Sequence, residues 1–211
     1  MKRCNFLIFL STGLLFFIGQ APAQASSWTL GGSLGYAVGD TGTSAINREL
    51  SDLGLNATAT SNSDNRNAWK AYIGYQHSSN WGGEVGYVNL GQVTTTLNGR
   101  TSDINAFLTS VRDIPPQTAQ GWQVVGSYRY SIDNISNIVI KTGLLAWTNQ
   151  YTLKSTTVSQ KVSNNGVSGV MGLGIETELI SNVMLSANAS HYRIEGEPIS
   201  VLDFGVMYRF D

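Results

Sequence analysis

The chain has 211 residues, of which 13% are charged, 42% hydrophobic and 10% aromatic, and its formal net charge is −1. Soluble domains usually carry about 25% charged residues, so the low charge is the unusual feature of this composition. A near-neutral chain with no basic run argues against a nucleic-acid partner and against a polybasic membrane-surface site. The length allows one large domain or two small ones.

The first residues have the features of an export signal. Lys2 and Arg3 precede an apolar run, Phe6–Ile18, which is followed by Ala23-Gln24-Ala25. A positive start, a short apolar centre and a small-x-small end are typical of a secretory signal peptide. The apolar run is shorter than the roughly 20 residues of a spanning helix, which disfavours a membrane anchor. We therefore expect cleavage after residue 25.

Cleavage would leave residues 26–211 as the mature chain, which we treat as one domain. Cys4 is the only cysteine and would leave with the signal peptide. The mature chain would then have no disulfide and no cysteine-based metal site.

Alternation of apolar and polar residues with a period of two dominates the remaining chain and predicts strands. The predicted strands have 10 to 13 residues, slightly above the roughly 9–11 that a tilted strand needs to cross a bilayer. The eight segments are Ser27–Val38, Ala68–His77, Trp81–Gln92, Ala119–Ser131, Ile138–Gln150, Gly166–Glu178, Val183–Arg193 and Ser200–Phe210.

The connections between these segments alternate in length. The long connections are Gly39–Asn67, Val93–Thr118 and Tyr151–Asn165, whereas the short ones are Ser78–Asn80, Ile132–Asn137, Leu179–Asn182 and Ile194–Ile199. Alternating long and short connections predict periplasmic turns and extracellular loops, and an even number of strands places both termini in the periplasm. Only Ile194–Ile199 is short for an extracellular loop.

Two of the long connections contain apolar residues at helical spacing. Ser44–Leu53 is followed by Gly54, a candidate C-cap, and Ser102–Ile114 is stopped by Pro115 and Pro116. We expect two short amphipathic helices at the outer rim, where they either bind a partner or cover the barrel mouth.

The composition of the two strand faces favours a membrane barrel over a soluble barrel or sandwich. The less apolar face is mostly Gly, Ser, Asn and Gln, whereas the outside of a soluble barrel would be dense in charges. Aromatic residues near strand ends are typical of interfacial girdles. They are Trp28, Trp69, Trp81, Tyr87, Trp122, Tyr128, Tyr130, Tyr208 and Phe210. The sequence therefore predicts an all-β, eight-stranded antiparallel up-and-down transmembrane β-barrel, with an interior filled by side chains.

Seven charged residues fall on the predicted inward face. They are Lys70, Glu84, Arg129, Lys141, Glu176, Asp203 and Arg209. A shielded ion needs a partner, and four cations with three anions permit a paired network. Ionisable groups inside a membrane protein also suggest a gate or a proton path. We favour a structural plug.

Candidate catalytic groups are few. His77, Ser78 and Ser79 with Glu84 nearby suggest a nucleophile and base, but they lie in a predicted three-residue turn. His191 has no serine at a suitable spacing. We therefore expect no enzymatic activity and no catalytic residue. With two histidines and no mature cysteine, we expect no metal site and no cofactor.

Four stretches resemble the N-terminal transmembrane domain of OmpA-like outer membrane proteins. They are Trp28–Tyr36, Trp69–Tyr75, Glu84–Gly91 and Leu202–Phe210. The resemblance implies an eight-stranded barrel with buried charges, in which Glu84, Lys141 and Glu176 occupy positions that the family tends to use. Ser186 stands where an interior arginine is often found. The family's terminal aromatic, recognised by the assembly machinery, corresponds to Phe210, although Asp211 follows it. Many members carry a periplasmic peptidoglycan-binding domain, which we do not expect here.

These observations predict a structural or surface-interaction protein of the Gram-negative outer membrane. The expected partners are outer-membrane lipid and lipopolysaccharide, the barrel assembly machinery and an extracellular surface partner. The alternative is a barrel that modifies lipid A or binds a small ligand.

Overall fold

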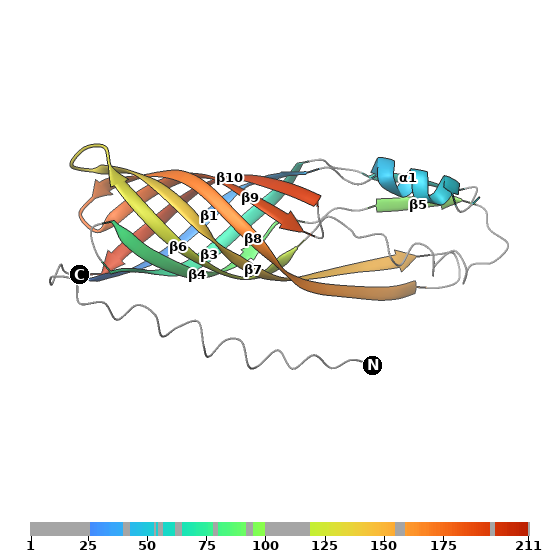
Figure 1. Ribbon diagram of the computed structural model, residues 1–211, viewed down its shortest axis with the longest axis horizontal. Helices are drawn as coiled ribbons and strands as arrows, with labels where there is room; N and C mark the ends of the chain where they lie inside the picture. The colour runs from blue at the N-terminus through green and yellow to red at the C-terminus, as the bar shows by residue number, and fades with distance from the viewer. Residues whose placement is uncertain are drawn as a thin grey trace.

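The computed structural model describes residues 26–39, 43–52, 54, 57–61, 65–77, 80–91, 95–99, 119–154, 159–194 and 197–210. Eight antiparallel strands close into a barrel in the order β1-β10-β9-β8-β7-β6-β4-β3 (Figure 1). Their bounds are β1 Ser27–Gly39, β3 Asn65–Gln76, β4 Trp81–Asn89, β6 Gln120–Ser131, β7 Ser136–Lys154, β8 Ser159–Ile180, β9 Val183–Ile194 and β10 Glu197–Phe210.

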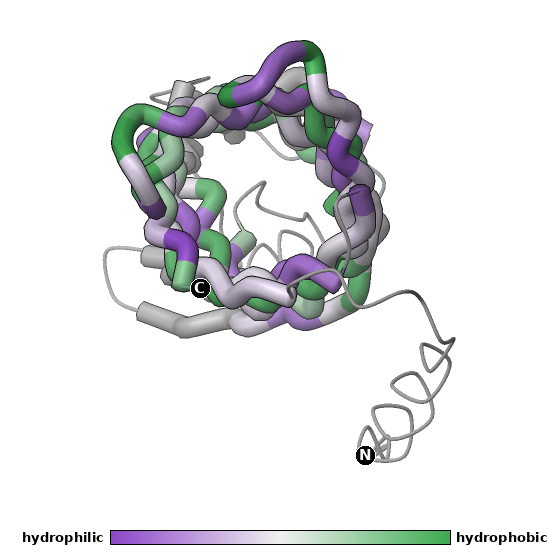
Figure 2. Tube along the Cα trace, turned by 90° about the vertical axis from the view of Figure 1, so that its left-hand side faces the viewer, coloured by the Kyte–Doolittle hydropathy of each residue, from purple (hydrophilic) through white to green (hydrophobic). Residues whose placement is uncertain are grey.

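Each barrel strand pairs with the next barrel strand along the chain, and β1 closes the ring against β10. The closing ladder runs from Trp28 paired with Phe210 to Gly39 paired with Ile199. Figure 2 looks into the resulting ring, along which hydrophilic and hydrophobic positions alternate. The predicted eight-stranded up-and-down barrel is confirmed.

The barrel carries its apolar side chains on the outside. On β1, Leu34 is 74% exposed and Tyr36 is 63% exposed, whereas their neighbours Ser33 and Ala37 are buried in the interior. A soluble barrel would have the opposite arrangement, because apolar surface is unfavourable in water. An apolar outer band is what the hydrocarbon region of a bilayer requires, and closure pairs the backbone groups that lipid cannot solvate.

Tight turns join the strands at one end of the barrel, which we call the turn end. These turns connect Gln76 to Trp81, Ser131 to Ser136 and Ile180 to Val183, and residues 78–79 of the first connection lie outside the described residues. Asn182 adopts a positive φ of 71°, a left-handed conformation in which asparagine is enriched. Aromatic side chains gather here, with Trp28 on Tyr75 and Trp81 on Tyr128, each with ring centroids 4.9 Å apart.

At the opposite end, which we call the loop end, ordered structure continues beyond the barrel wall (Figure 1). Helix α1, Thr43–Asp52, confirms the helix predicted over Ser44–Leu53. Gly54 follows it with φ 67°, and its N–H donates to the Ser51 carbonyl at 2.9 Å. No helix among the described residues is both long enough and apolar enough to span a bilayer.

A second small sheet at the loop end was not predicted. It consists of β2, Ala57–Ser61, paired with β5, Thr95–Gly99. Both strands have only five residues and no aromatic residue, so they lack the long alternation of large apolar residues on which the strand predictions depended. The helix predicted over Ser102–Ile114 and the signal peptide predicted over residues 1–25 lie outside the described residues.

The prediction of a long loop over Tyr151–Asn165 is wrong. Strand β7 continues to Lys154 and β8 begins at Ser159, with Tyr151 paired with Val162. Beyond Thr148 and Val170 these two strands pair only with each other and form a free-standing ribbon. A ribbon outside the barrel has no buried face, so its sequence need not alternate.

Several strand bounds also differ from the predictions, and the largest of the other shifts are in β3, β4 and β10. Strand β10 starts at Glu197, so the connection predicted over Ile194–Ile199 shrinks to residues 195–196, and β3 starts three residues before Ala68. Strand β4 stops at Asn89 instead of Gln92, because the Asn89 side chain accepts the N–H of Gly91, whose φ is 83°. An asparagine that hydrogen-bonds its own backbone two residues on starts a turn.

Candidate functional site

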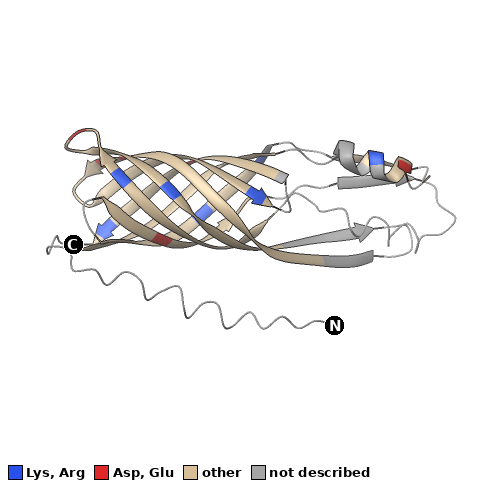
Figure 3. Cartoon of the chain, in the orientation of Figure 1, with Lys and Arg blue, Asp and Glu red and all other residues tan. Residues whose placement is uncertain are grey.

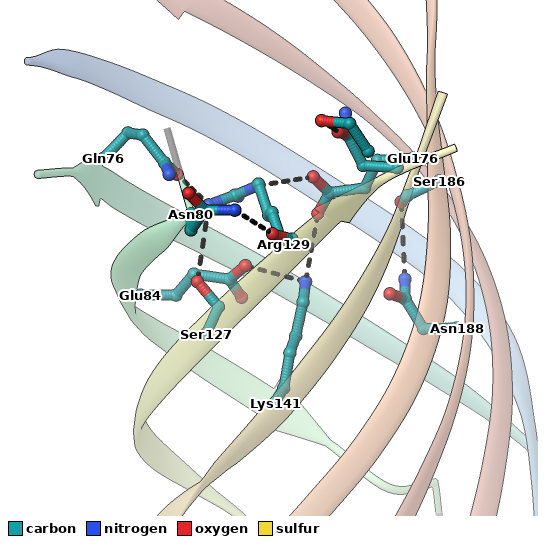
Figure 4. A network of polar contacts seen from close by, with 11 residues as sticks. Gln76, Asn80, Glu84, Ser127, Arg129, Lys141, Glu176, Ser186 and Asn188 are labelled. Atoms are coloured by element: carbon teal, nitrogen blue, oxygen red, sulfur yellow. Dashed lines mark hydrogen bonds and ion pairs between the residues drawn. The ribbon is translucent and has the colours of Figure 1, made fainter. Parts of the chain in front are cut away.

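Four charged side chains meet inside the half of the barrel nearer the turn end, and we call them the charge cluster. They are Glu84 on β4, Arg129 on β6, Lys141 on β7 and Glu176 on β8 (Figure 4). The charge cluster is a prominent feature because charged residues are sparse along the strands (Figure 3).

Lys141 lies at the centre of the charge cluster. Its Nζ is 2.7 Å from Glu84 Oε1 and 3.5 Å from Glu176 Oε1. The other Glu176 oxygen, Oε2, accepts a hydrogen bond of 2.9 Å from Arg129 Nε, and the Glu176 side chain is fully buried. Arg129 also donates to Gln76 at the turn end. The chain of contacts therefore links five strands, β3, β4, β6, β7 and β8, from inside the barrel.

The strand register places these groups together. Lys141 lies opposite Ser127 on β6 and opposite Gly172 on β8. A small residue on each side leaves room for the long lysine side chain to cross the interior. Since both carboxylates accept from cations, the charge cluster compensates the cost of removing each ion from water.

An interior tyrosine accompanies the charge cluster, and the sequence analysis missed it. The ring of Tyr72 lies 5.0 Å from Lys70 Nζ and 5.7 Å from Lys141 Nζ, which are cation–π distances. A Cβ at Gly31 would lie 2.5 Å from Tyr72 Cζ, and one at Gly86 would lie 2.6 Å from Tyr72 Cβ. Two inward glycines beside an inward aromatic position are the signal that could have revealed it.

The remaining three predicted charges lie outside the charge cluster. Lys70 and Asp203 are buried in the interior, but neither makes an ion pair among the described residues. Asp203 accepts a hydrogen bond of 3.0 Å from Asn188, which also donates to Ser186 at 3.4 Å. Arg209 lies at the turn end, half-buried, with Nη2 3.4 Å from Glu178 Oε2.

The half of the interior nearer the loop end is apolar, which differs from the polar interior that we predicted. Leu145 and Trp147, which interrupt the alternation on β7, point inward, and Trp147 Nε1 donates to Ser168 at 2.8 Å. The packed set is Ala37, Ala68, Val88, Leu90, Ala119, Val125, Leu145, Trp147, Val170, Tyr192, Ile194, Ile199 and Val201. We call this set the apolar half.

The histidines occupy two different settings. The backbone N–H of His77 donates to the Trp81 carbonyl at 3.0 Å and so closes the turn, while Ser78 and Ser79 lie outside the described residues. His191 pairs across β9 and β10 with Ser200, with Nδ1 3.2 Å from Oγ, on the outer surface. The sequence analysis did not predict this contact, because the two residues are nine positions apart in the chain and meet only through the pairing of β9 with β10.

The described residues hold neither a complete catalytic triad nor a metal cluster at these positions. Within the described part of the chain, no carboxylate or amide side chain contacts His191 to orient its ring, as a hydrolytic triad requires. Likewise, the described ranges contain no group of three His, Cys, Asp or Glu side chains that could hold a metal ion.

Known structures share the fold. Neisserial surface protein A is 9% identical, with 89% of this chain and 100% of that chain covered and a TM-score of 0.50. Ail of Yersinia pestis is 13% identical, with coverages of 88% and 97% and a TM-score of 0.49. The N-terminal β-barrel domain of Pseudomonas aeruginosa OprF is 9% identical, with coverages of 87% and 97% and a TM-score of 0.48. No curated protein sequence matches the chain.

The family assignment rests on sequence as well as on fold. The family model for the OmpA-like transmembrane domain matches residues 23–211, which include every strand of the barrel and the whole charge cluster. The closed eight-stranded barrel with an apolar exterior is the architecture that such a domain requires. The chain therefore belongs to the family of OmpA-like transmembrane domains, the β-barrels of the outer membrane.

Proposed function

We propose that this outer-membrane barrel has a structural and surface-contact role, with the loop end outside the cell and the turn end in the periplasm. The observation that carries the proposal is the asymmetry of the two ends. Helix α1, the β2–β5 sheet and the β7–β8 ribbon all extend from the loop end, whereas tight turns form the other. Outer-membrane barrels have longer connections outside and short turns in the periplasm.

The filled interior supports a structural role over transport. Eight strands enclose a space that side chains fill, and here the charge cluster and the apolar half occupy it. The charge cluster then acts as a plug that joins strands from inside. In this proposal both termini are periplasmic and residues 1–25 are removed on export. The barrel assembly machinery recognises the strand that ends at Phe210.

The partners follow from the two surfaces. The apolar outer band fits the acyl chains of outer-membrane lipid and lipopolysaccharide, and the loop end is the surface available to an extracellular partner. The proposal includes no nucleic-acid partner, no cofactor and no enzymatic activity.

Site-specific proteolysis of intact cells tests the orientation. A protease recognition sequence inserted after Gly91, at the loop end, should be cut in intact cells. The same sequence inserted between Ser181 and Asn182, at the turn end, should be cut only after the outer membrane is permeabilised. Cleavage of the second variant but not the first in intact cells would reverse the proposed topology.

A barrel that modifies lipid A is the alternative function, and the exposed His191–Ser200 contact is the observation that favours it. Deletion of the gene should weaken the envelope barrier without changing lipid A if the role is structural. Mass spectra of lipid A from cells that carry wild type, His191→Ala, Ser200→Ala or His77→Ala separate the two functions. A lipid A species that depends on the wild-type protein and disappears in the His191 and Ser200 variants would refute the structural proposal.

A further inference from the structure

Arg66 is a buried cation without a partner among the described residues. It lies on β3 at the loop end, faces the barrel interior and is 3% exposed. None of its three guanidinium nitrogens makes a hydrogen bond, and no described carboxylate forms an ion pair with it. A guanidinium cannot be deprotonated in a protein, so this positive charge has to be compensated in another way.

The other interior charges do not compensate Arg66. Three cations, Lys70, Arg129 and Lys141, accompany three anions, Glu84, Glu176 and Asp203, so that set is balanced without Arg66. All six lie nearer the turn end than Arg66 does.

The surroundings of Arg66 are apolar. Arg66 lies opposite Ala37 on β1, and the nearby Leu90 and Ile199 belong to the apolar half. Its charge is therefore surplus among the described interior charges, and the side chains of Ala37, Leu90 and Ile199 have no acceptor to offer it.

Two glycines leave the space beside this arginine free of side chains. A Cβ at Gly39 would lie 3.0 Å from Arg66 Nη2 and 3.4 Å from Ile199 Cγ1. A Cβ at Gly91, whose φ is 83°, would lie 2.5 Å from Arg66 Cβ. Backbone without a side chain thus borders the Arg66 guanidinium at Gly39 and the base of its side chain at Gly91.

We propose that Arg66 binds an oxyanion, a carboxylate or phosphate group of a water-soluble molecule, inside the loop end of the barrel. The planar guanidinium fork matches both groups, because two parallel N–H donors can reach two oxygens at once. The bound anion supplies the charge and the acceptors that the described residues do not. Because Arg66 is buried on the inner face of β3, an anion bound to it lies inside the barrel. Lipid headgroups outside the wall do not reach this position.

Unfolding of the full chain in detergent micelles tests the proposal, with inorganic phosphate and acetate as probes. Phosphate or acetate replaces chloride at constant ionic strength, so that general screening stays the same. In the wild type, the thermal midpoint should rise with the logarithm of the oxyanion concentration, because a ligand that binds only the folded state stabilises it. Equilibrium dialysis of radiolabelled phosphate against the folded wild type should give one site per chain.

Three variants assign the effect to this site. Arg66→Gln should lose the dependence on oxyanion, whereas Arg193→Gln, an exposed arginine at the same barrel end, should keep it. Gly39→Ala keeps the charge but places a methyl group against Nη2, so it should shift the response to at least several-fold higher concentrations. If Arg66→Gln does not fold, Arg66→Lys takes its place. Lysine keeps the positive charge but lacks the planar fork of donors, so the rise of the thermal midpoint with oxyanion concentration should be smaller.

A thermal midpoint of the wild type that does not respond to phosphate or acetate would overturn the proposal, since Arg66 would then form an ion pair with a carboxylate of the chain itself. An equal response in the wild type and in Arg66→Gln would overturn it as well. The orientation tests are distinguishable from this outcome, because they measure protease access in intact cells and not the response of stability to an oxyanion.

Discussion

Lys141 compensates the charge of two buried carboxylates, because it forms an ion pair with both Glu84 and Glu176. Glu176 keeps a second partner in Arg129, but Glu84 makes no other ion pair among the described residues. Removal of one partner from a buried ion pair is far more costly than replacement of the whole pair, because a charge stays behind without compensation.

We therefore expect Lys141→Met to lower the free energy of unfolding by about 3–5 kcal/mol. Lys70→Met is the matched control, since Lys70 is equally buried but makes no ion pair, and its cost should be smaller. Urea unfolding of both variants in lipid vesicles, followed by tryptophan fluorescence, measures the difference. An equal loss in the two variants would contradict the central role of Lys141.

At this scale the sequence predicts which side of the wall a residue occupies, but not which residue it meets. Alternation places Lys141 and Glu176 on the same face of their strands. Their contact depends on the stagger of strands around the ring, which the sequence pattern does not contain. The inward positions of Tyr72 and Trp147 were not predicted, because aromatic residues were expected on the lipid face. Tyr72 fits inside because two inward glycines leave space for its ring, and Trp147 fits because Ser168 accepts its hydrogen bond.

Among the elements, the turn at residues 132–135 is stabilised by its own carboxylate. Asp133 Oδ1 accepts hydrogen bonds from the backbone N–H of Ile135 at 2.8 Å and of Ser136 at 2.7 Å. These two donors, Ile135 first, lower the pKa of Asp133 below its usual range, because they favour the ionised form.

A lowered pKa in the folded state fixes the direction of the pH effect. Asp133 contributes stability above its unfolded pKa of about 3.9, and this contribution is lost as the pH falls through its lower, folded pKa. The wild type should therefore be more stable than Asp133→Asn at pH 7, and the difference in urea midpoint should shrink below about pH 4. A difference that stays constant from pH 7 to pH 2 would contradict this role of the carboxylate.

The β7–β8 ribbon is the element for which sequence and structure disagree most. Period two identifies a strand only when its two faces meet different solvents, as they do in the barrel wall. Residues 149–154 and 159–165 lie beyond the positions at which β7 pairs with β6 and β8 pairs with β9, so they are not part of the wall that imposes the alternation. Helix α1 was predictable because its apolar spacing and Gly54 are local signals.

Because the outer ribbon pairs only with itself, its removal should leave the barrel intact. We expect replacement of residues 151–162 by a two-residue Asn-Gly turn to change the unfolding free energy by less than about 0.5 kcal/mol. Heat-dependent mobility on gels and urea midpoints measure this. Removal of residues 185–190, within the wall, is the control and should abolish folding. Loss of the folded form in the first variant would mean that the ribbon supports the barrel.

For the whole molecule, the divided interior determines whether ions pass. Apart from Arg66 and the hydrogen-bonded groups of Trp147 and Tyr192, the described side chains of the half nearer the loop end are apolar, and ions are costly to transfer into such surroundings. We expect no sustained current from the wild type in planar bilayers.

Adjacent residues on β7 provide a matched test of this barrier. Leu145 is fully buried and Leu144 is 58% exposed on the lipid face. Leu145→Ala should cost about 2–5 kcal/mol of stability and raise the ion leak, whereas Leu144→Ala should do less of both. A steady current through the wild type, or equal effects of the two substitutions, would argue against the apolar half as the barrier.

The ladder between β1 and β10 has a consequence for the order of biogenesis. Strand β1 has two partners, one next along the chain and one at the far end of the barrel sequence, so its second edge stays open until β10 is available. The cylinder therefore cannot close progressively during export, and the nascent chain has to be held with an exposed edge until its last strand arrives. Loss of β10 should accordingly produce not a smaller cylinder but an open sheet with two unsatisfied edges, a substrate for degradation by periplasmic proteases.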